Sequence, residues 1–566
     1  MQKKWWMESV GYQIYPKSFF DSNDDGIGDL KGITQKLDQL KHLGINLIWI
    51  CPFYDSPMDD NGYDVRDFYK VSPMFGDLND LKTLIDKAHQ LGFKIMLDFV
   101  LNHTSDEHPW FIESKKSKDN PYRDYYIWRR GRMHQGKQIP PNNWGSFFGG
   151  SAWQYDAETD QYYMKIFSNK MPDLNWENPK VRHEMKAIAQ YYIDLGIDGF
   201  RIDAVSHLDR GDFKDTIGQP DDIILDWKKF SNLPRVMTYL KELNQEVFKP
   251  SNSFTIGEVG GEATITEALK FAAFKADALD TVFNFDHNWC NNLWDIDDLS
   301  NLKTDVICLK KAFKKWHDAF ESKGFLPLNW LNHDQPRLMS HYGSTVYPKK
   351  SGKMLATALY FMRGIPFIYQ GEEIGMTNYP FKKIEEFNDV ATLYAYHDKR
   401  KKHPNMPEEK LIKELAKTTR DHPRTPYQWS DAPHAGFTKG NPWLSVNPNY
   451  RDINLENQIN DPDSLWSYYQ KVIHLRRFSN YRETIIYGSY KILDFEHPNL
   501  YTYIRCLNHQ ILLVISSFSE DIQTYDLKTY DIIEVVLHND KHLKINGQTI
   551  TLNPYEAIVL SVKERI

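Results

Sequence analysis

The stretch DGFRIDAV at residues 198–205 places two charged side chains inside an apolar run that is typical of a buried strand. Because side chains alternate across a strand, Arg201 and Asp203 point to the same side, and the guanidinium lies beside the carboxylate. A neighbouring cation favours the ionised acid and lowers its pKa, which suits a carboxylate nucleophile. Taken alone, the strand favours the plainer interpretation of a buried structural ion pair.

The elements around this stretch predict a barrel. Short β-rich apolar runs alternate with amphipathic helical stretches, which indicates repeated βα units. Eight strand candidates occur, the number that a (β/α)8 TIM barrel needs, and a doubly wound open sheet is the alternative. The candidates are residues 10–16, 46–52, 94–100, 198–205, 253–259, 281–286, 326–334 and 365–371.

Two insertions and one change of pattern divide the chain into domains. Residues 104–172 are rich in Trp, Tyr, Asn and Gly without a helical period, and predict a loop-rich inserted B domain after the third strand. Residues 377–460 follow the eighth strand and predict a subdomain over the same face. Alternating strands from about residue 485 predict a C-terminal antiparallel β-sandwich domain, residues 485–566. The barrel then comprises residues 1–103 and 173–484.

Acidic residues end four of the expected strands. These residues are Asp98, Asp203, Glu258 and Asp334. Active sites of βα barrels lie at the carboxyl ends of the strands, so the four acids are expected at one mouth. One such carboxylate could be structural, but four would repel one another unless the site used negative charge. The sequence therefore predicts an active site built on carboxylates.

Paired carboxyls of this kind suit a sugar that develops positive charge at its anomeric carbon. Retaining glycoside hydrolysis needs an ionised nucleophile and a second carboxyl that stays protonated until it donates to the leaving oxygen. Asp203, beside Arg201, fits the first role. Glu258, with no cation next to it in the sequence, fits the second.

Several motifs resemble a known family. The blocks LDFVLNH (97–103), GFRIDAV, IGEVGG and NHD, in this order at strand ends, resemble the alpha-amylase superfamily of glycoside hydrolases. Further motifs, including DNGYDV, NNWGSFFGG, YQGEEIGM and RTPYQW, resemble its oligo-1,6-glucosidase and α-glucosidase branch over nearly the whole chain. The resemblance implies that Asp203 is the nucleophile, Glu258 the acid/base and Asp334 a third acid that holds sugar hydroxyls. It also implies a glucose site lined by Tyr63, Asp98, His103, Phe167, Arg201 and His333.

The resemblance further implies exo action. Asp60 and Arg420 would form a pair that caps the non-reducing O4 of the bound glucose and closes the pocket, so that one terminal glucose leaves per cut. The alternative is a rim salt bridge worth about 0–1 kcal/mol with no role in binding.

Two positions depart from the pattern of this branch. Met171 stands before PDLN, where the branch usually has Gln. After the nucleophile, members selective for α-1,6 links typically carry Val and α-1,4-acting relatives carry Ala or Thr; here the residue is Ala204. Strict alternation would point Ala204 away from the pocket, so a role in specificity requires the strand end to twist.

We therefore predict a retaining exo-α-glucosidase that favours short α-1,4 malto-oligosaccharides, with transglycosylation open. The alternative is an oligo-1,6-glucosidase. Three further alternatives are a trehalose-6-phosphate hydrolase, a sucrose isomerase and a non-catalytic superfamily member. Sucrose isomerases carry an arginine-rich loop where residues 293–300 read LWDIDDLS, and the intact acids speak against a non-catalytic role.

A metal loop is expected after the first strand. The side chains of Asp21, Asn23, Asp25 and Asp29 and the carbonyl of Ile27 reproduce the ligand spacing of a calcium loop. The twelfth place lacks the EF-hand Glu, and the alternative is a plain Asx-rich turn. The resemblance to related glucosidases implies structural calcium, and no organic cofactor is expected.

Composition limits the partners. A net charge of −7 argues against nucleic acid. The absence of a signal-peptide-like start and of any run of about 20 apolar residues predicts a cytoplasmic protein without a membrane partner. The expected partner is a small oligosaccharide, and monomer and dimer both stay open. Four cysteines, without metal-site spacing, predict free buried thiols rather than disulfides or zinc.

Overall fold

Eight parallel strands form the centre of the molecule, which is described here as a computed structural model covering residues 2–260, 263–296 and 301–565. The order in the sheet is β13-β12-β11-β5-β2-β1-β15-β14, and the end strands β13 and β14 lie beside each other, so the barrel is nearly closed. All eight strand predictions are confirmed. The strands are β1 (Gly11–Ile14), β2 (Leu47–Ile50), β5 (Lys94–Val100), β11 (Gly199–Asp203), β12 (Phe254–Glu258), β13 (Thr281–Phe283), β14 (Pro327–Leu328) and β15 (Ile365–Tyr369).

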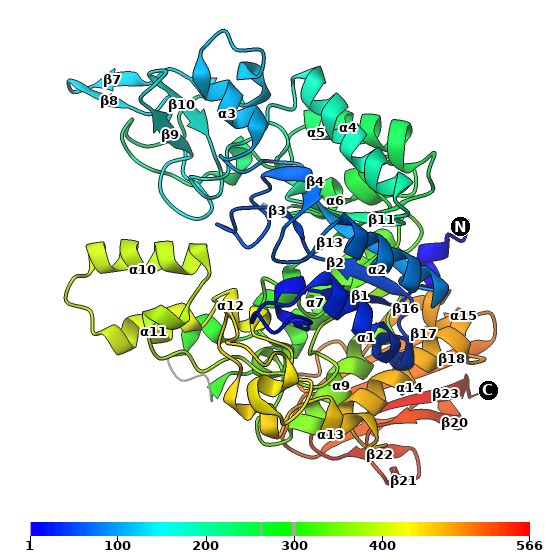
Figure 1. Ribbon diagram of the computed structural model, residues 1–566. Coiled ribbons are helices and arrows are strands. Elements are labelled where there is room, and N and C mark those ends of the chain that lie inside the picture. The colour runs from blue at the N-terminus through cyan, green and yellow to red at the C-terminus, as the bar shows by residue number, and fades with distance from the viewer. Residues whose placement is uncertain (1, 261–262, 297–300, 566) are drawn as a thin grey trace.

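Helices follow the strands in sequence and surround the barrel (Figure 1). Asp29 caps the first of them, accepting a hydrogen bond from the backbone of Gly32, and Gly44 ends it in the left-handed conformation. The helices are α1 (Leu30–Leu43), α2 (Leu78–Gln90), α4 (Pro179–Asp194), α5 (Arg235–Leu243), α6 (Ile265–Ala272), α7 (Val306–Phe320), α8 (Leu338–His341), α9 (Pro348–Tyr360), α14 (Leu465–Phe478) and α15 (Arg482–Tyr487).

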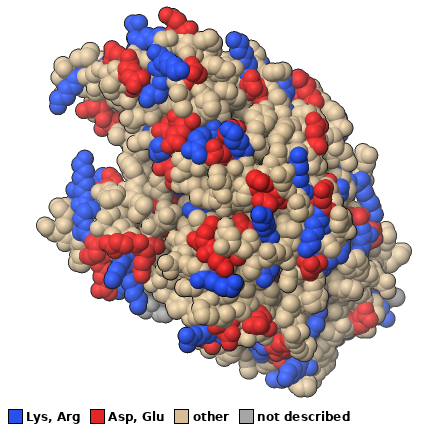
Figure 2. Space-filling model, in the orientation of Figure 1, with Lys and Arg blue, Asp and Glu red and all other residues tan. Residues whose placement is uncertain are grey.

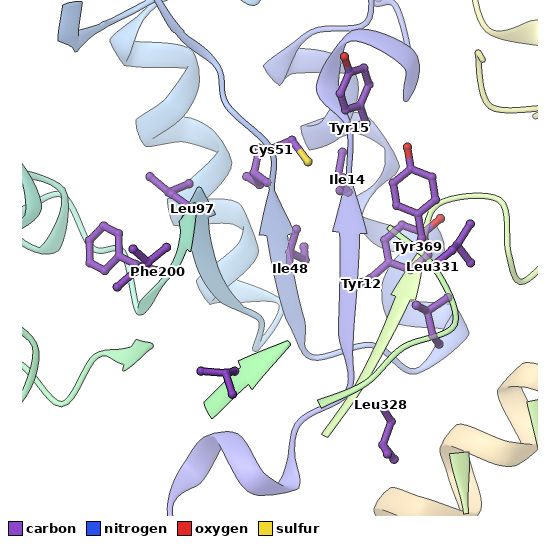
Figure 3. Packing of buried hydrophobic residues seen from close by; sticks show 14 of the residues in the cluster. Tyr12, Ile14, Tyr15, Ile48, Cys51, Leu97, Phe200, Leu328, Leu331 and Tyr369 are labelled. Atoms are coloured by element: carbon purple, nitrogen blue, oxygen red, sulfur yellow. The ribbon is translucent and has the colours of Figure 1, made fainter. Parts of the chain in front are cut away.

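Side chains of the strands divide between two cores. Alternate residues such as Trp49, Met96 and Ile256 pack inside the barrel. Their neighbours face the helices, and Figure 3 shows two of these, Ile48 and Leu97, on adjacent strands. Charged residues at the carboxyl ends of the strands therefore stand on a packed apolar floor.

Two lobes project from the barrel and face each other (Figure 1). One contains the segment after β5: α3 (Pro109–Lys116), β6 (Trp128–Arg129), β7 (Arg132–His134), β8 (Lys137–Ile139), β9 (Trp153–Asp156) and β10 (Gln161–Met164). The helix α3 was not expected from the sequence pattern. The other lobe contains α10 (Val390–Lys402) and α11 (Glu408–Ala416), and shorter helices α12 (Asp421–Arg424) and α13 (Glu456–Ile459) follow. Figure 2 shows the surface hollowed between the two lobes.

The first lobe also includes a segment that lies far away in the sequence. The indole of Trp144 donates to the carbonyl of Lys214 at 2.8 Å, and Arg132 pairs with Asp215 at 2.6 Å. Residues after β11 thus pack on the segment inserted after β5, which the sequence did not indicate.

The C-terminal part is a β-sandwich, as predicted. Its five-stranded antiparallel sheet has the order β16-β17-β18-β23-β20, and a three-stranded sheet has the order β19-β22-β21. Residues such as Leu513 and Leu560 pack between them against Tyr525 and Ile550. The strands are β16 (Ser489–Leu493), β17 (Leu500–Leu507), β18 (Gln510–Ser517), β19 (Gln523–Asp526), β20 (Tyr530–His538), β21 (Lys544–Asn546), β22 (Thr549–Leu552) and β23 (Ala557–Glu564).

The cysteines correct one prediction. Cys290 and Cys308 form a disulfide with a Cα–Cα distance of 5.3 Å, while Cys51 and Cys506 are free. The expectation of four free thiols was wrong because the chain folds back after β13 and brings Cys290 to the first turn of α7. Disulfides persist mainly in oxidising compartments, so this disulfide does not support the predicted cytoplasmic location. That location stays a prediction. No helix within the described residues has the length and apolar character that crossing a membrane requires.

Candidate active site

One guanidinium, that of Arg201, binds three carboxylates at the barrel mouth. Its Nη1 donates to Asp98 at 2.5 Å and to Asp203 at 2.7 Å, and its Nη2 donates to Glu258 at 2.6 Å. The parallel register of β5, β11 and β12 places Arg201 directly opposite Asp98, with Glu258 at the end of the next strand. The barrel thus brings these acids together from three strands.

The pKa of Asp203 is raised well above its ordinary value. Burial is the main cause; Arg201 opposes it, and the charges of Glu258 and Asp98 add to it. The sequence led us to expect that Arg201 would lower this pKa, and the net direction is the opposite because one cation serves three acids. Asp203 therefore takes up a proton at a higher pH than an ordinary aspartate does.

Asp334 has different partners. Arg424 donates to it at 2.7 Å, and Arg420 lies 3.7 Å away. Burial alone would raise the pKa of Asp334, but the surrounding positive charges hold it well below its usual range. His333 contributes only when protonated, and burial lowers its own pKa to about 3, so the two arginines carry the effect at neutral pH. Asp203 and Asp334 thus have environments that push their pKa values apart, as the acids of glycosidase sites often do.

Asp98 and Arg201 lie behind the cavity wall and do not line it, unlike the expectation that both would face the glucose. The indole of Trp49 donates to Asp98 at 2.9 Å, and the hydroxyl of Tyr63 lies 3.1 Å from the same carboxylate. Tyr63 also lies 2.7 Å from Nε2 of His333, and the two rings stack. This buried network fixes the wall from which Tyr63, His333 and Asp203 face the cavity.

His103 faces the cavity with an unused ring nitrogen. Its Nε2 is buried without a hydrogen-bond partner among the described residues, although an unpaired buried polar atom costs free energy. Burial lowers the pKa of His103 to about 4, so the ring is neutral at pH 7. Nε2 is thus available for a hydroxyl group of a ligand.

The cavity has a volume of about 850 Å³, within the range of roughly 300–1,000 Å³ that is usual for ligand pockets. Asp60 and Arg420 lie at one end, where Arg420 donates to Asp60 at 2.8 Å and to the buried Asp389 at 2.6 Å. The guanidinium of Arg420 also lies 4.8 Å from the ring of Phe148. The Asp60–Arg420 pair expected from the sequence is therefore formed, and both side chains are largely buried.

Aromatic side chains of the first lobe form one wall. Phe167 lies where it was expected, with its ring 5.3 Å from that of His103, and Phe147 stacks on it. A Cβ at Gly149, whose φ is +95°, would lie 2.3 Å from the ring of Tyr394 in α10. Only glycine allows the lobes to approach this closely above the cavity.

Ala204 lines the cavity because the strand ends just before it. β11 stops at Asp203, and Ala204 adopts φ 46° and ψ 32°, in the left-handed region. This turn removes the strict alternation that would have pointed Ala204 away, so the twist that its expected role requires is present.

Several residues of the site were missed by the sequence reasoning. Phe147, Phe148 and Arg424 stand within motifs that were recognised, NNWGSFFGG and RTPYQW, so a signal for them existed. Trp227, Trp289 and Asp389 lie outside those motifs, and only the folded chain places them here. The missed residues that line the cavity are Phe147, Phe148, Trp227 and Trp289. Asp389 and Arg424 were also missed and do not line it; they bind Arg420 and Asp334, which do.

The expected calcium loop forms a series of Asx turns. Both oxygens of Asp21 accept backbone hydrogen bonds, and Asp29 accepts from Ser22 as well as capping α1. The carboxylates of Asp21 and Asp29 are buried without an ion-pair partner among the described residues, and burial raises the pKa of Asp29. No group of three His, Cys, Asp or Glu side chains in those residues is placed to hold a metal.

Comparison with known proteins identifies the family. Residues 13–487 match the family described as alpha amylase, catalytic domain. The chain belongs to the alpha-amylase family. Residues 500–559 match the alpha-amylase SusG C-terminal domain, in the β-sandwich. The protein is thus a glycoside hydrolase, with the catalytic-domain match spanning the strands that carry the acids.

Similar proteins show which members of the family this chain resembles. The oligo-1,6-glucosidase of Bacillus cereus is 45% identical over 573 residues and covers 100% of both chains. The alpha-glucosidase of Pediococcus pentosaceus is 43% identical over 510 residues, covering 89% of each chain. The crystal structure of Bacillus licheniformis trehalose-6-phosphate hydrolase has a TM-score of 0.90 and 39% identity, covering 99% of this chain and 100% of that one.

Proposed function

We propose that this alpha-amylase family member is a retaining, exo-acting α-glucosidase that releases glucose from the non-reducing end of short α-glucosides. The observation that carries the proposal is the Arg201 fork, which holds Asp203 and Glu258 side by side in a cavity closed by Asp60 and Arg420. Two adjacent carboxyls suit a double displacement, and a closed end suits the removal of one terminal sugar.

In the proposed reaction the carboxylate of Asp203 attacks the anomeric carbon. Glu258 donates its proton to the glycosidic oxygen as that bond breaks, leaving a covalent glucosyl ester on Asp203. Glu258, now ionised, takes a proton from a water molecule that attacks the same carbon and frees Asp203. Asp334, ionised beside Arg424, and the unpaired Nε2 of His103 would bind hydroxyl groups of the glucose.

The experiment follows the first product by NMR. Retention requires that α-glucose appears before mutarotation, and initial release of β-glucose contradicts the proposal. Asp203→Asn should lower kcat by several orders of magnitude while the melting temperature stays near that of the parent. Near-native turnover in this variant would show that another residue is the nucleophile.

For linkage, we propose α-1,6-linked oligosaccharides as the preferred substrates, since the names of the most similar relatives support this alternative. The α-1,4 preference expected from Ala204 is the second candidate, and two observations favour it: Ala204 lines the cavity next to Asp203, and one relative is named alpha-glucosidase. Comparing kcat/KM for isomaltose and maltose separates the two.

A phosphorylated substrate is less favoured. Among the described lining residues, the Lys and Arg cations are Lys315 and Arg420, and both are paired with acids: Lys315 with Asp286 at 2.8 Å and Arg420 with Asp60 and Asp389. A phosphate would need unpaired cations. The argument against sucrose isomerisation depended on the segment 293–300. Residues 297–300 of this segment lie outside the described residues.

We also propose that calcium binds the loop from Asp21 to Asp29. The donors would be side-chain oxygens of Asp21, Asn23, Asp25 and Asp29 and the carbonyl of Ile27, all oxygen ligands of the kind calcium prefers. The two buried carboxylates without a cationic partner support this proposal. The metal would neutralise them and join the loop to the start of α1.

A further inference from the structure

An exposed tryptophan, Trp289, lies at the open end of the cavity. It ends η7 (Asp286–Trp289), the short helix after β13, and lines the same cavity as Glu258. Its side chain is 66% exposed, whereas Asp60 at the closed end is 4% exposed. In the proposed binding mode, in which Asp60 and Arg420 cap the non-reducing end, the rest of an oligosaccharide extends past Glu258 toward Trp289.

The backbone beneath Trp289 is held firmly. The hydroxyl of Tyr342 donates to the carbonyl of His287 at 2.5 Å. The next residue in the chain, Cys290, is joined by the disulfide to Cys308 at the start of α7. A fixed backbone means that little conformational freedom is lost when a ligand binds to the side chain it presents.

The indole itself is free to accept a ligand. Within residues 2–260, 263–296 and 301–565, no aromatic, cation–π or hydrogen-bond partner of the Trp289 side chain occurs. Beside it in the cavity wall, Asp286 accepts from Lys315 at 2.8 Å and from the indole of Trp316 at 2.9 Å through one oxygen. An apolar ring face next to a charged hydrogen-bonding pair matches a pyranose, which has apolar faces and hydroxyl edges.

We propose that Trp289 is a stacking platform for the second sugar unit beyond the cleaved bond, with Asp286 and Lys315 binding its hydroxyls. This site rests on the proposed glucosidase function and extends it: the enzyme prefers trisaccharides and longer chains over disaccharides. The disulfide to Cys308 positions the platform and takes no part in catalysis.

The test compares kcat/KM for two substrates of different length in the same variant. A change in the catalytic step affects both values equally and does not change their ratio. For each linkage, the ratio of kcat/KM for the trisaccharide to that for the disaccharide is measured in the parent and in Trp289→Ala. Loss of about 60 Å² of stacked apolar surface corresponds to about a tenfold fall in this ratio. Trp289→Phe should recover most of it, because a smaller ring keeps part of the stacking surface.

Trp294 supplies a matched control. It belongs to the same loop and is 61% exposed, but it does not line the cavity. Trp294→Ala should leave the ratio unchanged, and a fall equal to that of Trp289→Ala would overturn the proposal. If the parent enzyme cleaves disaccharides and Trp289→Ala does not change the ratio, the platform proposal is overturned. The proposed glucosidase function then still stands.

Binding distinguishes failure of the platform from failure of the proposed function. If no α-glucoside is cleaved, the glucosidase proposal fails, and calorimetry with isomaltotriose and maltotriose then judges the platform. Weaker trisaccharide binding by Trp289→Ala than by the parent supports the platform. Equal affinities, or no binding to the parent, overturn it.

Discussion

The carboxylates of Asp203 and Glu258 share one guanidinium, with Nη1 of Arg201 2.7 Å from Asp203 and Nη2 2.6 Å from Glu258. A third acid, Asp98, uses the same cation. The arrangement positions both proposed reacting groups rigidly, but it leaves the cluster with more negative than positive charge. The chemistry of the site follows from this imbalance.

The imbalance predicts the acidic limb of the pH profile. A nucleophile must be ionised, and the pKa of Asp203 is raised by burial and by Glu258 and Asp98. Activity is therefore present above this raised pKa and is lost as pH falls through it. The acidic midpoint of kcat/KM, which reports the free enzyme, should lie well above the ordinary Asp value of about 3.9. A midpoint at or below that value, with circular dichroism showing a folded protein, contradicts the assignment.

The pair of Asp60 and Arg420 predicts a fall in kcat/KM when it is weakened. Asp60→Asn keeps the shape of the side chain but removes the charge that Arg420 binds at 2.8 Å. Hydrogen bonds to charged groups contribute about 1.5–3 kcal/mol, so kcat/KM for disaccharides should fall about 10–150-fold. Asp389→Asn is the matched control, since Asp389 binds Arg420 without lining the cavity. Equal losses in both variants would mean that Asp60 acts only by holding Arg420.

Ala204 predicts a change in linkage preference. Ala204→Val adds two methyl groups to the wall beside Asp203, and differences of this size change kcat/KM by about 10–200-fold. The ratio of isomaltose to maltose hydrolysis should rise. Because Ala204 has φ 46°, a backbone conformation that β-branched residues rarely adopt, Ala204→Val should also lower the free energy of unfolding. Ala204→Gly, which adopts this φ freely, is the control and should shift the ratio toward maltose; an unmoved ratio in both variants would place linkage selection elsewhere.

Calcium at the loop from Asp21 to Asp29 predicts stabilisation by the metal. A ligand that binds only the folded state raises the melting temperature, so chelation should lower it and added calcium should restore it. In Asp21→Asn the melting temperature should no longer respond to calcium. Metal analysis of freshly purified protein without calcium, together with a melt that neither chelator nor calcium changes, would contradict the proposal.

The disulfide predicts a loss of stability on its removal. Cys290 and Cys308 enclose a segment with a sequence separation of 18, and closing a loop of this length stabilises the folded state by about 3 kcal/mol. Cys308→Ser should lower the free energy of unfolding in urea by about this amount. Cys506→Ser, at a half-buried free thiol, should change it little. Thiol titration of the denatured parent should find two free cysteines, and four would show that the disulfide is absent in solution.

The sequence by itself determined the barrel and the acids at its mouth. Apolar runs with turn residues between them predicted all eight strands, because strand and helix periodicities are local properties of the chain. Parallel strands place their carboxyl ends on one rim, so Asp98, Asp203 and Glu258 could be expected together from the sequence alone.

Only the tertiary structure decided how those acids are charged and what surrounds them. The pKa of Asp203 depends on how many acids share Arg201, and the disulfide depends on where the chain turns back after β13. Ala204 reaches the cavity through one left-handed residue, and Trp289 reaches it through a loop held by a distant helix. The pKa of Asp203 is set by distances between side chains of different strands, and the other outcomes are set by backbone conformations at turns. Electrostatic energies depend on such distances, and sequence periodicity contains neither the distances nor the turn conformations.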